Sequence, residues 1–282
     1  MKNTKLFRSI LFLIIFILIG VGLAYYVFAP KQNANVTDSW KANNPASTQS
    51  VDHSLWQLVL DDYLIDDDPG GVNLFDYQGY LDDESEGLES YLQYLQSINP
   101  TELNSAEQFA YWVNLYNALT VDVVLKDYPV NSIKEIGNSP LPTGPWNDPA
   151  ITIAGQELTL NHIEHSILRP IWNDYRIHFA VNCASIGCPD LQAEAFTASN
   201  TQALLEVSAS DYLNHPRGLQ LSDSTLTLSS IFDWYAGDFG ESEAQVIETL
   251  TKHLSAENKA KLATFDGSIK YDYDWGLNGL NE

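Results

Sequence analysis

The pattern of apolar and polar positions begins with an uncharged apolar run from Ile10 to Ala29. This run follows three basic residues and has about the ~20-residue length that a helix needs to cross a bilayer. Its end lacks the small residue that normally lies three positions before a signal-peptidase cut. We therefore expect residues 1–29 to form an uncleaved signal anchor. The basic end would stay in the cytoplasm, so we expect the rest of the chain outside it, in the periplasm of a Gram-negative cell.

Residues 30–52 are polar and nearly free of aliphatic side chains, which predicts a linker. The pattern then becomes amphipathic, and we expect one extracytoplasmic globular domain over residues 53–282. Helical spacing of apolar residues predicts short helices over residues 53–65 and 85–98. A longer helix is predicted from the capping-box pair Ser105 and Gln108 to Pro129.

One apolar stripe of the long predicted helix marks it as central to the core. The stripe consists of Phe109, Trp112, Val113, Tyr116, Leu119, Thr120, Val123 and Val124. Asn117 lies at the edge of this stripe, where an amide usually makes structural hydrogen bonds but could also orient a catalytic histidine.

The second half of the domain has a mixed pattern. We expect hairpins over residues 150–160 and 218–229, helices over residues 161–170, 197–213 and 242–254, and a buried strand over residues 176–181. A helical first half followed by a hairpin-containing half predicts an α+β fold, in which a helical N-terminal part packs on a small mixed or antiparallel sheet.

Composition makes the chain globular and acidic. It has 282 residues, 45% of them hydrophobic, and a formal net charge of -23 that arises from 37 acidic and 14 basic residues. Three of these basic residues precede the apolar run, so the domain itself is more acidic still. Such a surface repels phosphate backbones, and we expect no nucleic-acid partner. The membrane is the expected partner of the N-terminal helix, whereas a small-molecule or peptide ligand stays undefined.

Both cysteines of the chain lie in one stretch, "RIHFAVNCASIGCPDL". One interpretation makes a cysteine the nucleophile of a hydrolase or transferase acting on an amide or thioester. Cys188 is slightly favoured over Cys183, because Pro189 suits the first position of a helix whose N–H groups would lower a thiol pKa. Cys183 would instead lie at the end of the predicted strand.

Two histidines are candidate bases for this thiol. Strand alternation places His178 on the face opposite Cys183, which leaves His165 on the short helix as the better candidate. His165 precedes Cys188, so a cysteine hydrolase of this chain would have a permuted arrangement relative to papain.

Two other interpretations of the cysteines stay open. An oxidising compartment would favour a Cys183–Cys188 disulfide in a non-catalytic binding or structural module of the envelope. A metal site with His162 and His165 is disfavoured, because "HIEH" lacks the spacing of zinc motifs. No glycine-rich phosphate loop is present, and we expect no cofactor or metal.

Four motifs carry a resemblance to a known family. In order, they are "FAYWVNLYNALT", "LNHIEHSILRP", "RIHFAVNCASIGCPDL" and "LSSIFDWYAGDFG". Together they resemble the domain of unknown function 547 family, from about Phe109 to the C-terminal "YDYDWGLN". The resemblance implies the extent of the domain but no catalytic role, because the family's name records an unknown activity.

Overall fold

A computed structural model describes residues 33–139 and 141–280, which form one compact unit. The predicted signal anchor lies outside the described residues. None of the helices within the described ranges is long and apolar enough to cross a membrane.

The first half of the unit is helical, as its periodicity predicts. Its helices are α2 (Ala34–Trp40), α3 (Ser54–Tyr63), α4 (Tyr77–Asp82), α5 (Gly87–Gln96) and α6 (Ser105–Asp127), with 3-10 turns η1 (Pro100–Glu102) and η2 (Ile133–Glu135). Two short strands, β1 (Leu64–Ile65) and β2 (Leu74–Phe75), pair between α3 and α4. The side chain of Asn104, one residue before the predicted cap, accepts hydrogen bonds from the first turn of α6.

The second half mixes hairpins with short helices. It contains β3 (Ile151–Ile153), β4 (Gln156–Leu158), the π-helix η3 (His162–Leu168), α7 (Arg169–Trp172), η4 (Tyr175–Phe179), α8 (Thr201–Asn214), β5 (Leu219–Leu221), β6 (Thr225–Ser229), α9 (Ile231–Trp234), α10 (Ala236–Phe239), α11 (Glu243–Thr251), α12 (Ala256–Leu262) and β7 (Ser268–Asp272). Strands β3 and β4 form one antiparallel hairpin, and β5 and β6 form another. Strand β7 pairs in parallel with β6, with Ile269 opposite Leu226, which completes a three-stranded mixed sheet. The α+β prediction is therefore confirmed.

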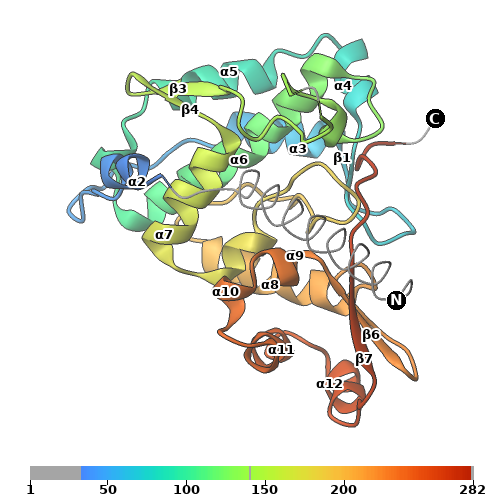
Figure 1. The fold of residues 1–282 in the computed structure, drawn as a ribbon. Helices are drawn as coiled ribbons and strands as arrows, with labels where there is room; N and C mark the ends of the chain where they lie inside the picture. The colour runs from blue at the N-terminus through green and yellow to red at the C-terminus, as the bar shows by residue number, and fades with distance from the viewer. Residues whose placement is uncertain (1–32, 140, 281–282) are drawn as a thin grey trace, which may run out of the picture. The chain divides into compact units, whose positions relative to one another are not determined.

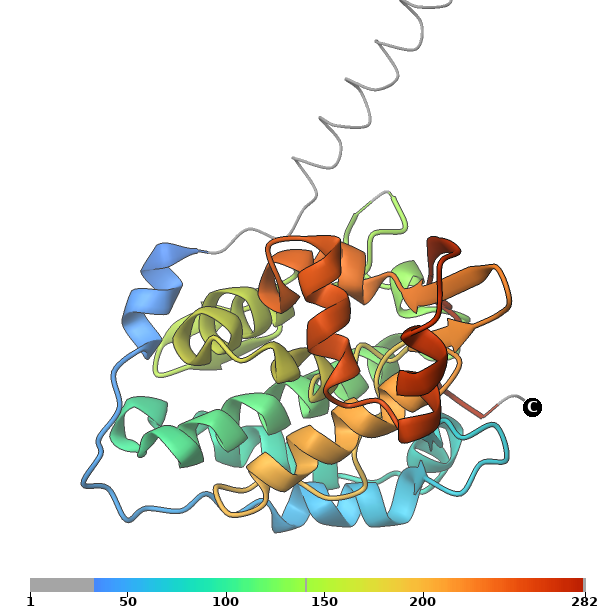
Figure 2. The same cartoon turned by 90° about the horizontal axis from the view of Figure 1, so that it is seen from below.

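Helix α6 lies in the interior of the helical part, between η3 on one side and α3 and α5 on the other (Figures 1 and 2). Every residue from Gln108 to Val121 is buried. The predicted stripe is thus only one part of a helix that is covered on all sides. Its buried polar side chains bond to the backbone of other segments, as described below for Asn117.

Helix α2 occupies the segment for which the sequence predicts a polar linker. Val36 and Trp40, four residues apart, lie on one face of this helix and are buried. Trp40 packs edge-on against Trp112 with ring centroids 5.2 Å apart, and Gln108 donates a hydrogen bond to the Trp40 carbonyl. The packed domain therefore begins near residue 33, because two apolar residues at helical spacing suffice to dock a polar segment.

The prediction of a strand over residues 176–181 is wrong. Residues 176–179 belong to the 3-10 turn η4, because the Asp174 carboxylate accepts from the backbone N–H of Arg176 and also binds its guanidinium, which starts a helical turn. Ile177 packs into the helical core, whereas Phe179 packs among Tyr212, Phe232 and other side chains above the mixed sheet. The turn η4 therefore joins the two halves of the core.

Candidate functional site

The two cysteines lie in a loop that follows η4 and is held by asparagine side chains. Asn117 of α6 donates to the carbonyl of Ala180 and accepts from the backbone N–H of Asn182, both at 2.9 Å. The Asn182 side chain in turn accepts from the N–H of Ala184 and donates to the carbonyl of Pro189, both at 2.8 Å. Asn117 thus positions the backbone of the cysteine loop, and its amide makes no hydrogen bond to a histidine.

The C-terminal segment fixes the other side of this loop. The N–H of Ile186 donates to the carbonyl of Gly276, and the N–H of Gly187 donates to the carbonyl of Asp274, both at 2.8 Å. A Cβ atom on Gly187 would lie only 2.7 Å from the backbone nitrogen of Asp274. The glycine between the cysteines is therefore required for close approach of two backbone segments.

Both cysteines are free thiols, and their sulfurs lie 2.9 Å apart. The backbone N–H of Cys183 donates to Cys188 Sγ at 3.0 Å, and the neutral thiol of Cys183 also donates to Cys188 Sγ, at 2.9 Å. Cys188 is buried, with 3% of its surface exposed, whereas Cys183 is partly exposed. Cys183 is therefore the more accessible sulfur, and Cys188 can donate to it once Cys183 has lost its proton.

Two hydroxyl groups complete the surroundings of Cys183. Its sulfur lies 3.2 Å from Ser185 Oγ and 3.0 Å from the hydroxyl of Tyr273, and these two oxygens lie 2.9 Å apart. A neutral thiol has one proton, which Cys183 donates to Cys188, so the hydroxyls of Ser185 and Tyr273 supply the protons within this triangle. When the thiol loses its proton, both hydroxyls can turn toward the sulfur.

The surroundings of the two thiols shift their pKa values in opposite directions. The hydrogen bond from Cys188 lowers the pKa of Cys183, and the bonds from Ser185 and Tyr273 add to this effect against the opposing influence of burial. Burial raises the pKa of Cys188 well above its ordinary value. Burial also raises the pKa of Tyr273, so this hydroxyl stays protonated and can donate. Cys183 is thus the sulfur at which a thiolate is stabilised.

The helix predicted to begin at Pro189 is absent from the described structure. Residues 189–200 contain no helical element, and α8 begins only at Thr201. The helix-dipole reason for favouring Cys188 is therefore wrong. The carbonyl of Pro189 instead accepts a hydrogen bond from Asn182, which ties the end of the loop back to its beginning.

A second group of polar side chains comes from η3, α7, η4 and α10. The π-helical spacing of η3, in which the N–H of Arg169 donates to the carbonyl of Glu164, buries Glu164 and His165. His178 lies 2.7 Å from Asp238 through Nε2, and the guanidinium of Arg169 binds the same carboxylate at 2.6 Å. Burial alone would raise the pKa of Asp238, but these two partners hold it well below its usual range.

Glu164 links this group to the cysteine loop. Its carboxylate accepts a hydrogen bond from Tyr116 at 3.0 Å and lies 3.8 Å from Nδ1 of His178. Burial is the main cause of the raised pKa of Tyr116, and negative charge on Glu164, Cys183 and Cys188 contributes. Glu164 likewise opposes ionisation of Cys183. The carboxylate and the sulfurs therefore lie close enough to affect each other's charge.

Tyr235 extends the connection between the two groups. Its ring stacks on His178 with centroids 4.5 Å apart, and the guanidinium of Arg169 lies over it at 4.8 Å. Burial raises the pKa of Tyr235, and the charges of Glu164 and both cysteines influence it as well.

The structure brings some of the predicted site residues together and not others. Cys183 and Cys188 lie in the cysteine loop that Asn117 of α6 holds, whereas His165 and His178 belong to the group around Glu164. Within the described ranges, no hydrogen bond joins either histidine to a sulfur. His165 accepts a hydrogen bond from Arg169 at Nδ1, and burial lowers its pKa to about 4, so the ring is neutral.

Sequence reasoning missed Glu164, Arg169, Ser185, Tyr273 and the partner of His178, Asp238. Local signals existed for Arg169, four residues after His165 on one helix, and for Ser185, two residues after Cys183. Tyr273 is separated from Cys183 by 90 residues and Asp238 from His178 by 60, so local spacing carries no sign of these contacts.

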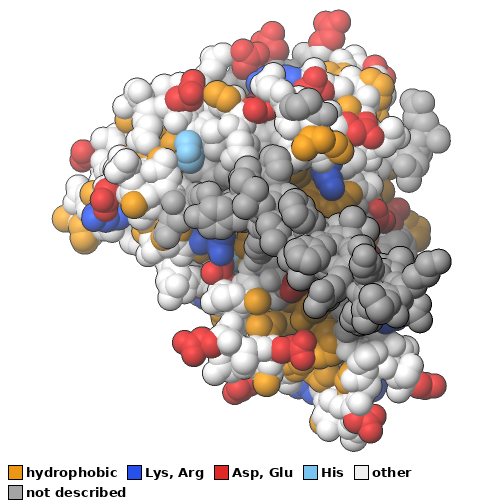
Figure 3. Space-filling model, in the orientation of Figure 1, with side chains coloured by type: hydrophobic (Ala, Val, Ile, Leu, Met, Phe, Trp, Pro, Cys, Tyr) orange, Lys and Arg blue, Asp and Glu red, His pale blue; other side chains and the backbone are white. Residues whose placement is uncertain are grey.

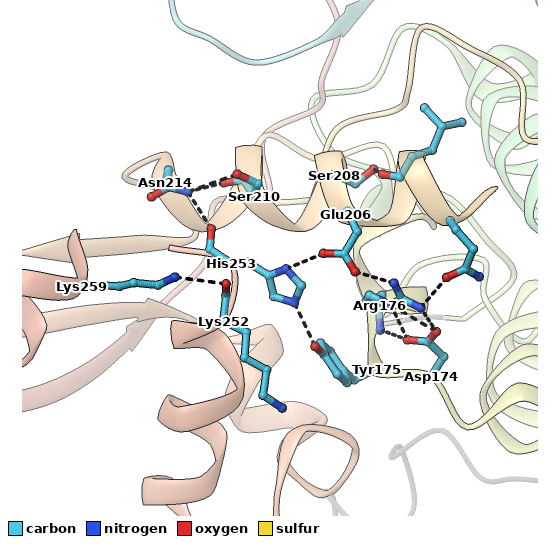
Figure 4. Close-up of polar contacts among 12 residues, drawn as sticks. Asp174, Tyr175, Arg176, Glu206, Ser208, Ser210, Asn214, Lys252, His253 and Lys259 are labelled. Carbon is cyan, nitrogen blue, oxygen red and sulfur yellow. Dashed lines mark hydrogen bonds and ion pairs between the residues drawn. The ribbon is translucent and has the colours of Figure 1, made fainter. Parts of the chain in front are cut away.

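A further polar cluster lies between η4, α8 and the residues after α11 (Figure 4). His253 contacts the hydroxyl of Tyr175 at 2.9 Å and the carboxylate of Glu206 at 3.2 Å. Arg176 binds Glu206 at 2.6 Å and also pairs with Asp174. This cluster contains no cysteine and serves to join α8 to the C-terminal helices. No group of three or more His, Cys, Asp or Glu side chains in the described ranges could hold a metal ion.

Comparison with known proteins gives one result. The family described as "Protein of unknown function, DUF547" matches residues 100–213, a segment that contains α6, η3, the cysteine loop and α8. No curated protein and no solved structure matches the chain. The match confirms the resemblance that the sequence motifs carry, and residues 100–213 of this chain are similar to the DUF547 family.

Proposed function

We propose that the domain is a cysteine-dependent hydrolase or transferase that acts on an amide or thioester, with Cys183 as its nucleophile. The observation that carries this proposal is the set of three groups around one partly exposed sulfur, each of which can donate a hydrogen bond to its thiolate. Cys188, Tyr273 and Ser185 lie at 2.9, 3.0 and 3.2 Å from Cys183 Sγ. Hydrogen bonds to an ionised group are stronger than those to a neutral one, so this arrangement favours the reactive thiolate.

The proposed reaction has two steps. The thiolate of Cys183 attacks the carbonyl carbon, a C–S bond forms, and the bond to the amine or thiol leaving group breaks as that group takes a proton. A water molecule or an acceptor amine or thiol then attacks the thioester and releases Cys183. Water makes the enzyme a hydrolase and another acceptor makes it a transferase.

His178 is the base that we assign to this reaction. In the neutral tautomer whose Nε2 donates to Asp238, Nδ1 faces Glu164 at 3.8 Å and can accept a proton. Asp238 would hold the ring in this tautomer, as the third member of a nucleophile–base–carboxylate arrangement. His165 has only Nε2–H to offer, since Nδ1 accepts from Arg169, and it would act as a hydrogen-bond donor.

Mass spectrometry of the acylated protein tests the proposal. The reduced full-length chain is incubated with an acetyl thioester or an acetyl anilide and quenched with acid, and we expect an acetyl group on Cys183 and none on Cys188. A Cys183→Ala variant should lose the acetyl group. His178→Ala should slow acylation and alter its pH profile, whereas His162→Ala, which changes a histidine outside both polar groups, should do neither.

A different outcome of the acylation and labelling experiments would contradict the catalytic proposal. If neither probe acylates a cysteine, and iodoacetamide alkylates Cys183 with the pH dependence of a free thiol near ~8.5, the catalytic proposal fails. A non-catalytic envelope module would then be favoured.

We also propose that residues 1–29 anchor the domain to the membrane from the extracytoplasmic side. The length and lack of charge of the Ile10–Ala29 run support this. The acidic side chains spread over the face seen in Figure 3 give that face little attraction for anionic headgroups. The chain should stay in the membrane fraction after carbonate or high-salt washing, and its release would contradict the anchor.

A further inference from the structure

We propose that Cys183 and Cys188 form a redox-modifiable pair, in which a hydroperoxide converts the nucleophile into a reversible disulfide. As a form of regulation of the same site, this inference rests on the proposed function. It adds a distinct role for Cys188, that of the resolving thiol.

The distance between the sulfurs is the first argument. They lie 2.9 Å apart as free thiols, whereas a disulfide bond is about 2.05 Å long. Bond formation therefore needs a small movement within a loop that both Asn182 and the C-terminal segment already hold. No unfolding of the loop is required to bring the thiols together.

The different environments of the two thiols are the second argument. Cys183 is partly exposed and surrounded by donors, which suits the thiol that meets an oxidant from solvent. Cys188 is 3% exposed, and its sulfur lies 2.9 Å from that of Cys183. A dissolved oxidant reaches one sulfur, and the second is placed to react only with the first.

The chemistry proceeds in two balanced steps. The thiolate of Cys183 attacks one oxygen of the hydroperoxide, an S–O bond forms, and the O–O bond breaks to release an alcohol or water after proton uptake. Cys183 is oxidised by two electrons to a sulfenic acid and the peroxide is reduced. The sulfur of Cys188 then attacks Cys183, the S–S bond forms, and the hydroxyl leaves as water with the proton of Cys188.

The oxidised pair would switch the site off and protect it. The disulfide removes the nucleophile and also the S–H donor that stabilises its thiolate. It prevents further oxidation of Cys183 to sulfinic or sulfonic acid, which thiols do not reverse. A dithiol reductant restores both thiols by exchange through a mixed disulfide and is itself oxidised to a disulfide.

Thiol counting on the full-length chain tests this inference. The reduced protein is treated with equimolar hydrogen peroxide, denatured and exposed to iodoacetamide. We expect loss of both alkylation sites and of two hydrogen atoms from the intact mass, with full recovery after dithiothreitol. A Cys188→Ala variant should instead accumulate a sulfenic acid on Cys183 that dimedone captures. A Cys183→Ala variant should keep Cys188 reduced.

Circular dichroism and the thermal midpoint show whether each cysteine variant is folded. If a variant does not fold, disulfide formation in the wild-type protein still tests the inference. Two thiols that remain alkylatable, or a sulfinic acid on Cys183 without a disulfide, would overturn the inference. The two proposals can fail independently. Disulfide formation without acylation of Cys183 would support the redox pair and contradict the proposed function. Acylation of Cys183 without disulfide formation would support the proposed function and contradict the redox pair.

Discussion

The guanidinium of Arg169 donates a hydrogen bond to Nδ1 of His165 across 2.8 Å. Arginine has no acceptor atom, so Nδ1 must be unprotonated and the neutral ring carries its proton on Nε2. Burial of His165 acts in the same direction and lowers its pKa to about 4. Arg169 itself is paired with Asp238 at 2.6 Å, so it stays in place as the donor.

This relationship predicts how stability depends on pH. The pKa of His165 is about 4 in the folded protein and about 6.5 when unfolded, so the unfolded chain binds more protons between these values. The stabilising contribution is complete above pH ~6.5 and is lost as the pH falls toward ~4, at roughly 1.4 kcal/mol per pH unit. Urea unfolding at several pH values measures this slope.

A His165→Gln variant should show a shallower slope, because the titrating group is gone. It should not become flat, since burial also lowers the pKa of His53 to about 4. His215→Gln, which changes a partly exposed histidine, should keep the wild-type slope. Equal slopes for the wild type and His165→Gln would contradict the prediction.

Asn117→Leu should destabilise the protein and disturb the cysteine loop. The substitution has a similar size but leaves the carbonyl of Ala180 and the N–H of Asn182 without their partner, at a cost of about 2–5 kcal/mol. Chemical denaturation measures the loss of stability. The pH dependence of iodoacetamide labelling measures the effect on Cys183, which should shift.

Helix α6 supplies a matched control for this change. Asn114 makes the same two-bond contact with the backbone of Phe196, outside the cysteine loop. Asn114→Leu should cost a similar free energy of unfolding yet leave Cys183 labelling unchanged. If both variants shifted the labelling alike, Asn117 would have no specific role in positioning the loop.

Tyr273→Phe should raise the pH at which Cys183 becomes reactive. The change removes the hydroxyl 3.0 Å from the sulfur, and a hydrogen bond to a charged group corresponds to about one pH unit. The midpoint of iodoacetamide labelling against pH reports the shift. Tyr271→Phe, on the same C-terminal segment, is the control. An unaltered midpoint in Tyr273→Phe would mean that this hydroxyl does not stabilise the thiolate.

Trp40→Ala should destabilise the domain by about 3–5 kcal/mol, because it removes a buried indole that packs on Trp112. The exposed neighbour Ser39 provides the comparison, and Ser39→Ala should change the free energy of unfolding by less than about 0.5 kcal/mol. Urea unfolding distinguishes the two. An unaffected Trp40→Ala variant would restore the interpretation of this segment as a tether.

The elements that sequence reasoning predicted correctly are those with local signals. Helices α3, α5, α6, α8 and α11 repeat apolar residues at helical spacing, and the two hairpins alternate around turns. Helix periodicity, caps and turn residues act over a few positions, so they can be recognised without the rest of the fold. The α+β class follows from the order of these elements along the chain.

Two local predictions failed for physical reasons. Residues 177–181 are all buried, so their pattern could not separate a strand from the 3-10 turn that Asp174 initiates. Pro189 suits the start of a helix but does not require one, and here its carbonyl closes the cysteine loop. In both places, hydrogen bonds of neighbouring side chains decided the backbone conformation.

By itself the sequence determined that two cysteines lie five positions apart in one stretch, that an asparagine borders the apolar stripe of the central helix, and that the chain is acidic. Only the tertiary structure decided which sulfur is surrounded by donors. Tyr273 reaches Cys183 across 90 residues, and Asp238 reaches His178 across 60. Such contacts arise when α6, η4 and the C-terminal segment pack together, and the free energy that places them comes from burial of the whole core rather than from any local pattern.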